Sequence, residues 1–228
     1  MYKGKRFIAV IPARGGSKGI PNKNVIEVVG KPLIAYTIET ALQSKYLDKI
    51  IVSTDSKKIA QVGKEWGAEV PFLRPAHLAT DEAKTIDTII HTLDQVEEEY
   101  DYVVLLQPTQ PLRKLKHIDE AIEQIVDKDQ ISLVSVSPVK QHPILMKTID
   151  KKGRAISILG ENSSVRRQDF TEVFVVDGTI YINKIDETLT NNISLNDNEY
   201  IYYTNDISID IDTLEDLRKF SKLIGGKL

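Results

Sequence analysis

Short runs of β-branched residues alternate with longer amphipathic stretches along this chain of 228 residues. The apolar runs that suit buried strands occupy residues 6–12, 49–54, 69–73, 102–107 and 131–137. Between them, apolar residues recur at helical spacing over residues 32–42, 56–66, 85–99 and 114–127. Strands that alternate with helices build a mostly parallel sheet covered by helices. The sequence therefore predicts an α/β fold.

One domain is expected over residues 1–228, because a chain of this length buries a substantial core by itself. The alternation breaks between residues 140 and 172, where the chain is polar and poorly periodic and Lys151-Lys152-Gly153 predicts a turn. We interpret this segment as an insertion that contains a hairpin. An apolar run over residues 173–182 predicts a strand or hairpin that returns to the core.

Charge and composition exclude several classes of protein. The formal charge of -3 argues against a general surface for nucleic acid or for anionic membranes. The absence of cysteine excludes disulfides, thiolate nucleophiles and cysteine zinc sites. No window reaches the roughly 18 apolar residues that cross a bilayer, and the N-terminus does not read as a signal peptide. We therefore expect a cytoplasmic protein.

A basic, glycine-rich loop follows the first predicted strand. Its glycines lack the Cβ atoms that would hold a ligand away from the backbone, and its cations suit a polyphosphate. Each charge-assisted contact to a phosphate oxygen contributes roughly 1.5 to 3 kcal/mol. The loop residues concerned are Arg14, Gly15, Gly16, Ser17, Lys18, Gly19 and Lys23. The spacing fits neither a Walker A loop, since Ile20 follows Gly19, nor a dinucleotide fingerprint, since Arg14 replaces its first glycine.

Two acids near the C-terminus indicate a metal site. Isoleucines alternate with Ser208, Asp210 and Asp212, and on a strand this period would place both aspartates on one face. Two such carboxylates repel each other unless a cation joins them, and Mg²⁺ prefers carboxylate and phosphate oxygens. Thr213 is expected to cap a final helix, with Asp216 three residues later.

Two alternatives to the metal site stay open from the residues alone. The aspartates could be an ordinary acidic strand end. Asp210 could also be the nucleophile of a dehalogenase-type phosphatase, because D-x-D-x-T followed by leucine occurs there. Such a nucleophile ends the first strand of its fold, whereas only 16 residues follow Asp212.

These motifs resemble one known family in combination. The run from Ile11 to Asn24 is similar to the signature of CMP-sialic acid synthetases, the N-acylneuraminate cytidylyltransferases that activate acidic nine-carbon sugars. Further matches follow in order at residues 51–55, 73–76, 105–113, 166–169 and 208–213. The resemblance implies a Rossmann-like nucleotidyltransferase fold and Mg²⁺-dependent transfer of CMP from CTP to the anomeric hydroxyl of the sugar, with release of pyrophosphate. It also implies a homodimer, formed in part by residues 140–172.

The resemblance assigns residues to each part of the site. For catalysis these are Arg14, Lys18, Lys23 and Asp212. The nucleotide is expected to contact the loop together with Asn24, Arg74, Ala83 and Thr85. The metal ligands correspond to Asp210 and Asp212. Sugar contacts are expected from Gln107, Arg167, Gln168 and Tyr181, where Arg167 is our candidate for the sugar carboxylate because a planar guanidinium binds it in bidentate fashion.

The match to the family pattern is incomplete. Several relatives have Pro-Asn-Gly before the strand that holds Tyr181, whereas this chain has Val176-Asp177-Gly178. The departure leaves the identity of the sugar open among N-acetylneuraminate, legionaminate and related nonulosonates. A cytidylyltransferase for the eight-carbon sugar KDO and a non-catalytic nucleotide-binding protein of the same fold are the alternative functions.

Overall fold

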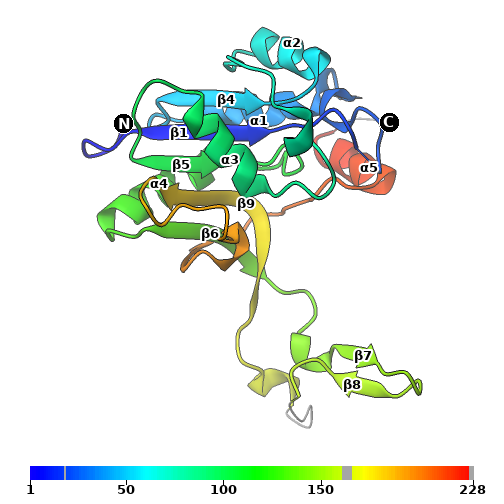
Figure 1. Cartoon of the computed structure of the whole chain (residues 1–228). Coiled ribbons are helices and arrows are strands. Elements are labelled where there is room, and N and C mark those ends of the chain that lie inside the picture. Colours follow the sequence, from blue (N-terminus) through cyan, green and yellow to red (C-terminus); the bar gives the residue numbers. More distant parts are fainter. Residues whose placement is uncertain (18, 161–165, 226–228) are drawn as a thin grey trace.

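A central sheet of six strands organises the protein in the computed structural model, which describes residues 1–17, 19–160 and 166–225 (Figure 1). The strands lie in the order β10-β6-β9-β5-β1-β4. β1 is parallel to β4 and β5, β10 is parallel to β6, and β9 is antiparallel to both of its neighbours. The bounds are β1 Phe7–Pro12, β4 Lys49–Ser53, β5 Tyr102–Leu105, β6 Ser132–Pro138, β9 Phe174–Lys184 and β10 Tyr200–Tyr203. The predicted α/β class is confirmed.

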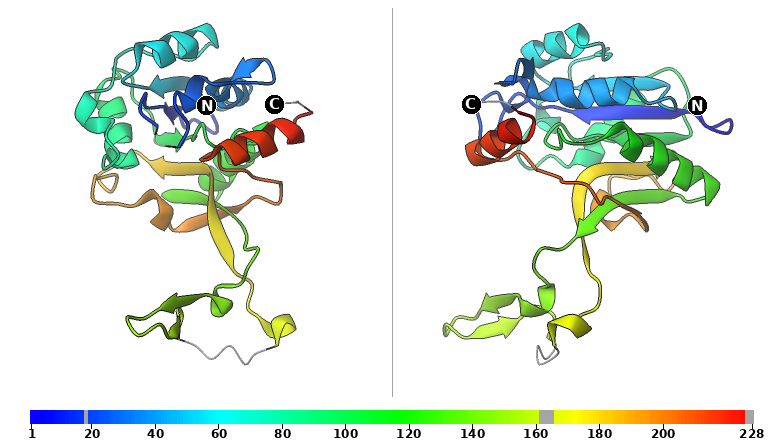
Figure 2. Two further views of the ribbon diagram at one scale, coloured as in Figure 1. Left: turned by 90° about the vertical axis from the view of Figure 1, so that its right-hand side faces the viewer. Right: turned by 180° about the vertical axis from the view of Figure 1, so that it is seen from behind.

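Helices cover both faces of the sheet (Figure 2). α1 (Leu33–Leu42), α2 (Lys57–Glu65) and α4 (Leu115–Asp127) contribute to one apolar cluster, and α3 (Thr85–Asp94) contributes to another. Successive side chains of a strand point to opposite faces, so β1 sends Phe7, Ala9 and Ile11 into the first cluster and Ile8 and Val10 into the second. All five of these side chains are fully buried.

Three sequence predictions were wrong in detail. Residues 69–73 form a single bridge from Glu69 to Ile51, because Pro71 has no N–H with which to continue a ladder. The helix expected over 85–99 ends at Asp94, before three consecutive glutamates that the negative helix C-terminus disfavours. Residues 204–213 are not a strand: the Ile207 side chain is 70% exposed whereas Ile211 is fully buried.

A third apolar cluster joins the two ends of the chain. α5 (Leu214–Leu223) begins at the predicted capping box, in which Asp216 N donates to Thr213 Oγ1 and Thr213 N donates to Asp216 Oδ2. α5 packs against the basic loop and against the hairpin of β2 (Glu27–Val28) and β3 (Lys31–Pro32). The buried members of the cluster are Ile20, Val28, Leu33, Ile211, Leu217 and Phe220. Burial of each large side chain contributes about 1.5–3 kcal/mol, so the loop and the C-terminal acids are held together.

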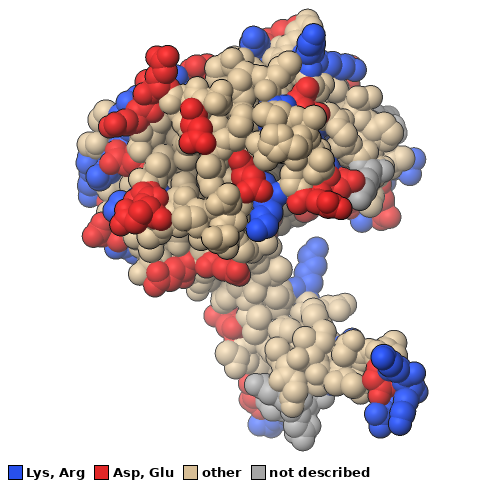
Figure 3. Space-filling model, viewed as in Figure 1, with Lys and Arg blue, Asp and Glu red and all other residues tan. Residues whose placement is uncertain are grey.

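A long excursion projects from this body between β6 and β9 (Figures 1 and 2). Its described part, residues 139–160 and 166–173, is called the arm below. The arm contains η3 (Pro143–Leu145), η4 (Arg167–Asp169) and a hairpin of β7 (Lys147–Ile149) and β8 (Ala155–Ser157). The hairpin tip carries a group of basic residues, Lys151, Lys152 and Arg154 (Figure 3). The arm also exposes large apolar side chains, including Ile149 at 75% and Ile158 at 58%.

Candidate active site

The basic loop and the C-terminal acids meet directly, although 189 positions separate them in the sequence. Lys23 lies at the start of η1 (Lys23–Val25), and its Nζ donates to Asp212 Oδ1 at 2.9 Å and to the Ile211 carbonyl at 2.7 Å. The loop backbone also packs closely on this segment, since a Cβ atom on Gly19 would overlap the Asp212 carbonyl oxygen. Burial of Ile20 beside Ile211 explains why the two segments come together.

A basic cavity of about 280 Å³ opens beside this contact at the carboxyl end of β1. Its wall combines the loop with the segment before α3 and with the turn after β5. The lining side chains with chemistry are Arg14, Lys23, Asn24, Arg74, Asp81, Thr85, Thr88, Gln107 and Thr109, and Ala83 contributes as well. In an open α/β sheet, ligands bind at the carboxyl ends of the strands.

Hydrogen bonds fix the shape of the loop around the basic cavity. Asn24 is buried, and its Nδ2 donates to the Arg14 carbonyl at 3.1 Å. The Gly15 amide donates to Asp55 Oδ1 at 2.8 Å. The Arg14 guanidinium forms an ion pair with Asp81 at 2.6 Å, which links the loop to the segment before α3. Arg14 is therefore held in place by groups that line or support the same cavity.

Arg74 places a buried cation in the wall of the basic cavity. The side chain is 6% exposed, and Nη1 donates to Thr88 Oγ1 at 2.8 Å, whereas the buried Nε has no acceptor among the described residues. Burial lowers the pKa of Arg74, Asp55 opposes this shift, and Arg14 adds to it. An unpaired buried donor costs about 1–3 kcal/mol. Burial of the Arg74 guanidinium beside the cavity therefore costs free energy in the folded protein.

A larger cavity of about 1100 Å³ lies between the sheet and the base of the arm. It shares Gln107 with the basic cavity and is lined at that end by Tyr181, Ser208 and Asp210. Desolvation raises the pKa of Asp210, as does the charge of Asp212, while a hydrogen bond from Thr109 and the charge of Lys23 oppose the rise. Asp210 is therefore a carboxylate whose charge is not fully balanced by the protein.

The two aspartates fit one end of a divalent-cation site. Carboxylates with incompletely balanced charge are suitable ligands for a hard cation. No group of three histidines or acids lies together in residues 1–17, 19–160 and 166–225, so the remaining ligands would be water or phosphate oxygens. That composition is typical of Mg²⁺ held beside a nucleotide.

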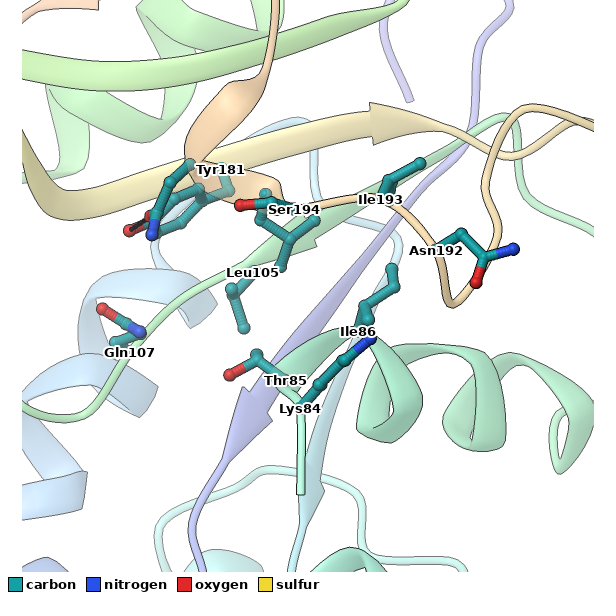
Figure 4. A pocket seen from close by; sticks show the side chains of 11 residues that line it. Lys84, Thr85, Ile86, Leu105, Gln107, Tyr181, Asn192, Ile193 and Ser194 are labelled. Atoms are coloured by element: carbon teal, nitrogen blue, oxygen red, sulfur yellow. Dashed lines mark hydrogen bonds between the residues drawn. The ribbon is translucent and has the colours of Figure 1, made fainter. Parts of the chain in front are cut away.

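A third cavity of about 330 Å³ lies beneath the segment that follows β9 (Figure 4). Residues 192–196 roof it, Thr85 and Ile86 of α3 line it, and Gln107 and Tyr181 connect it to the larger cavity. The Tyr181 hydroxyl donates to Asn196 Oδ1 at 3.1 Å. Burial, together with the charges of Asp177 and Asp210, raises the pKa of Tyr181 to about 12, so the phenol is a hydrogen-bond donor at neutral pH.

Arg113 supports Gln107 from within the core. It is 5% exposed, and its guanidinium donates to the carbonyl oxygens of Gln107 and Thr179 and to the Thr37 hydroxyl. Burial lowers the pKa of Arg113 to about 9, with Asp177 opposing, which leaves the group charged at neutral pH. Gly178 has a φ of +74°, and a Cβ there would lie 2.8 Å from Gln107 Oε1. The backbone and the side chain of Gln107 are thus both closely confined.

Most of the predicted site residues lie around these connected cavities. Arg14, Lys23, Asn24, Arg74, Ala83 and Thr85 line the basic cavity, and Gly15, Gly16 and Ser17 lie on its loop. Gln107, Tyr181 and Asp210 line the larger cavity, and Asp212 contacts Lys23. Lys18 lies outside the described residues, and of Arg167 only the backbone, in η4, is described. Gln168 is exposed on the arm and lines none of the three cavities.

Sequence reasoning missed several residues that shape the site. Thr109, Arg113 and Asp177 lie inside or beside the motifs, but residue type alone gave them no role. Asn196 lies in a short 3-10 helix, η5 (Leu195–Asp197), that carries no motif. The available sequence signal for Asn196 was the cluster of polar residues in Asn191-Asn192-Ile193-Ser194 and Asn196. Such a cluster is typical of any surface loop.

Comparison with known proteins decides the family. Residues 8–223 match the family model described as cytidylyltransferase. The chain belongs to the cytidylyltransferase family. It is 40% identical over 227 residues to CMP-N,N'-diacetyllegionaminic acid synthase of Legionella pneumophila, with 96% of each chain covered. It is 31% identical over 222 residues to pseudaminic acid cytidylyltransferase of Campylobacter jejuni, with 95% of each covered.

Some relatives in this family are longer. The N-acylneuraminate cytidylyltransferase of Streptococcus agalactiae is 39% identical over 212 residues, which are 92% of this chain and 51% of the relative. The chain thus spans about half the length of these relatives. The comparisons confirm the family that the motifs indicated.

Solved structures support the fold. A structure described as CMP:2-keto-3-deoxy-manno-octonic acid synthetase complexed with CTP has a TM-score of 0.75 at 19% identity and covers 96% of this chain and 98% of its own. The 4-diphosphocytidyl-2C-methyl-D-erythritol synthase of Anaerococcus prevotii has a TM-score of 0.69 at 15% identity, with 97% and 99% covered. The predicted nucleotidyltransferase fold is confirmed. Among the described helices, none has the length and apolar character to traverse a bilayer.

Proposed function

We propose that this protein transfers CMP from CTP to the anomeric hydroxyl of an acidic nine-carbon sugar and releases pyrophosphate. The observation that carries the proposal is the contact of Lys23, which lines the basic cavity, with Asp212, two residues after the Asp210 that lines the larger cavity. The basic cavity suits the nucleotide and the larger cavity suits the sugar. Lys23 would bind the phosphates, Asp212 would bind the metal, and these two side chains contact each other.

The reaction is an in-line displacement at the α-phosphorus of CTP. A bond forms between the anomeric oxygen and the α-phosphorus, the α,β-phosphoanhydride bond breaks, and pyrophosphate leaves with the bonding electron pair. The proton of the anomeric hydroxyl is released to solvent or to a base. Lys23 and Arg14, together with Lys18, stabilise the charge that grows on the β- and γ-phosphates.

Nucleotide binding exchanges partners at the ion pairs of the free protein. Lys23 leaves Asp212 for a phosphate oxygen, and Arg14 turns from Asp81 toward the triphosphate. Asp210 and Asp212 would then hold Mg²⁺, which supplies charge neutralisation at the α-phosphate when bound. Each exchange replaces one charge-assisted contact of the cation with another.

The acceptor is proposed to be a nonulosonic acid. Relatives that are similar over nearly the whole chain are named for diacetyllegionaminic acid and pseudaminic acid. Gln107 and Tyr181 present an amide and a phenol to the larger cavity, and the third cavity beside them gives room for an N-acyl group. KDO has no N-acyl group and would leave this room empty.

We propose a homodimer built through the arm. Isolated arms that expose apolar side chains, such as those of Ile149 and Ile158, gain free energy when a second copy covers them. Gln168 and Arg167 on η4 would then complete a sugar site together with the residues of the body.

A pyrophosphate-release assay tests the proposed function. Purified protein with Mg²⁺ is incubated with CTP, UTP, ATP or GTP and with N-acetylneuraminate, N,N'-diacetyllegionaminate, pseudaminate or KDO. We expect release only with CTP and a nonulosonic acid, and loss of release when EDTA replaces Mg²⁺. Activity with UTP or ATP but not with CTP would contradict the cytidylyl assignment, and a preference for KDO would contradict the acceptor.

A further inference from the structure

The segment that carries Asp210 and Asp212 has almost no backbone support. In the described part of the chain, its backbone amides are tied to other backbone groups only at the ends, where Thr204 N donates to the Val136 carbonyl and Ile211 N donates to the Thr109 carbonyl, each at 2.9 Å. Residues 205–210 between them have no strand neighbour. Thr109 donates a hydrogen bond to Asp210 itself, but residues 205–209 before it need a tie other than a strand ladder.

Asp206 is anchored to the first turn of α4. Its carboxylate accepts hydrogen bonds from Lys114 Nζ at 2.5 Å, from Lys116 Nζ at 2.8 Å and from His117 Nε2 at 2.8 Å. His117 Nδ1 accepts a hydrogen bond from the Lys114 amide, which places the imidazole hydrogen on Nε2. The three donors therefore converge on one carboxylate.

The anchoring helix is itself rigidly packed. Ile118, Ala121, Ile122 and Ile125 of α4 are fully buried in the largest apolar cluster. His117 is 4% exposed, whereas the Lys114 and Lys116 side chains are 55% and 52% exposed. Exposed ion pairs contribute little because solvent screens them, so the bond to the buried imidazole dominates. The segment is thus tied to the core at Asp206, two residues after its first supported end.

We propose that Asp206 is a positioning residue that holds Asp210 and Asp212 where they bind the divalent cation of the proposed reaction. The role of the cation rests on the proposed function, whereas the anchoring of the segment by Asp206 does not. Without the anchor, the segment must lose conformational freedom each time the two carboxylates come together on a cation. Cation affinity then falls, while the chemistry of the loaded site is little changed.

The test uses Asp206→Asn in the full chain, with two readouts. The first is hydrogen exchange of the Ile211 amide in the metal-free protein, followed by NMR, which is expected to become about tenfold faster if one charge-assisted contact is lost. The second is the Mg²⁺ concentration that gives half-maximal pyrophosphate release, expected to rise about tenfold with kcat at saturating Mg²⁺ near the wild-type value. Asp206→Glu keeps the charge and is expected to recover most of both.

Asp127→Asn is the matched control. Asp127 ends the same helix, and its carboxylate accepts from Lys3 and from the Tyr2 hydroxyl on the protein surface. This variant should leave both readouts unchanged. Wild-type values of either readout in Asp206→Asn would overturn the proposal, and so would a loss of kcat that excess Mg²⁺ does not restore. If the wild-type protein released no pyrophosphate, the proposed function would fail, and the exchange rate would still decide whether Asp206 anchors the segment.

Discussion

At the scale of single residues, Gly19 is where the loop and the C-terminal acids leave no room for a side chain. A Cβ there would overlap a backbone oxygen, which cannot move aside as a flexible side chain could. We expect Gly19→Ala to lower kcat/KM for CTP by at least tenfold, because the loop must shift away from Asp212. Steady-state kinetics with CTP as the varied substrate measures this effect.

Gly16→Ala provides the folding control for this change. An added methyl at Gly16 meets nothing within 4 Å, so the melting temperature of that variant should equal that of the wild type. The Gly19→Ala protein should unfold at a slightly lower temperature but remain cooperative. Wild-type kinetics in Gly19→Ala would show that the close approach of the loop to Asp212 is unimportant.

The Lys23 ammonium makes a second prediction at this scale. Lys23→Met removes the charge but retains most of the stem, and we expect kcat to fall by about 10²–10³-fold, the usual effect of deleting one group that stabilises transition-state charge. Lys3→Met, which breaks an exposed ion pair with Asp127, is the matched control and should leave kcat unchanged. Near-normal turnover in Lys23→Met would remove the residue from the proposed mechanism.

At the scale of elements, the contacts of Asp206 that anchor residues 204–212 should affect how the free energy of unfolding depends on pH. Hydrogen bonds from Lys114, then Lys116 and His117, hold the pKa of Asp206 well below its usual range. A depressed pKa in the folded state stabilises the protein above the unfolded pKa of about 4 and loses this effect as the pH falls below it. The difference in unfolding free energy between the wild type and Asp206→Asn should therefore be smaller at pH 3 than at pH 5. Urea denaturation at these pH values measures the difference, and an unchanged gap at pH 3 would contradict the assignment.

The arm gives a prediction about assembly. Ile149→Lys combined with Ile158→Lys places charges on its two most exposed isoleucines, and we expect the purified protein to change from dimer to monomer in sedimentation or light scattering. Leu223→Lys, at a leucine that is 51% exposed at the end of α5, is the matched control and should leave the dimer intact. A wild-type monomer at micromolar concentration would contradict the proposed dimer.

Sequence predicted those elements whose signals are local. The cap at Thr213 is a hydrogen bond within one turn, and it is observed. The period-two alternation at Ile207–Asp212 predicted a strand that does not form, because a strand also needs a neighbouring strand with which to pair. The segment is tied to α4 by a side chain instead. Asn196 could not be predicted, since its role depends on where η5 lies relative to Tyr181 of β9. Local chemistry thus indicated both halves of the candidate site, and tertiary packing determined how they are supported.

At the scale of the whole molecule, the body should fold and bind nucleotide without the arm. β6 and β9 are antiparallel, and Pro138 is paired with Phe174 where the arm departs. Replacing residues 139–173 by Asn-Gly would close the two strands as a hairpin, because this dipeptide suits a two-residue turn. The residues of the basic cavity all lie outside the replaced segment. We expect a monomer whose Tm falls by no more than about 4 °C, the shift that corresponds to roughly 1 kcal/mol in a chain of this size.

The shortened protein should separate nucleotide binding from transfer. CTP with Mg²⁺ should still raise its Tm, since ligands that bind only the folded state stabilise it. Sugar-dependent pyrophosphate release should be lost, because the larger cavity loses the wall that Val139, Lys140 and Met146 supply. Lys23→Met in the same background is expected to diminish the response to CTP, which verifies that the shift reports the basic cavity. If the shortened protein still transferred CMP, the whole sugar site would lie in the body. If it did not fold, the arm would be part of the folding unit rather than an appendage for assembly and sugar binding.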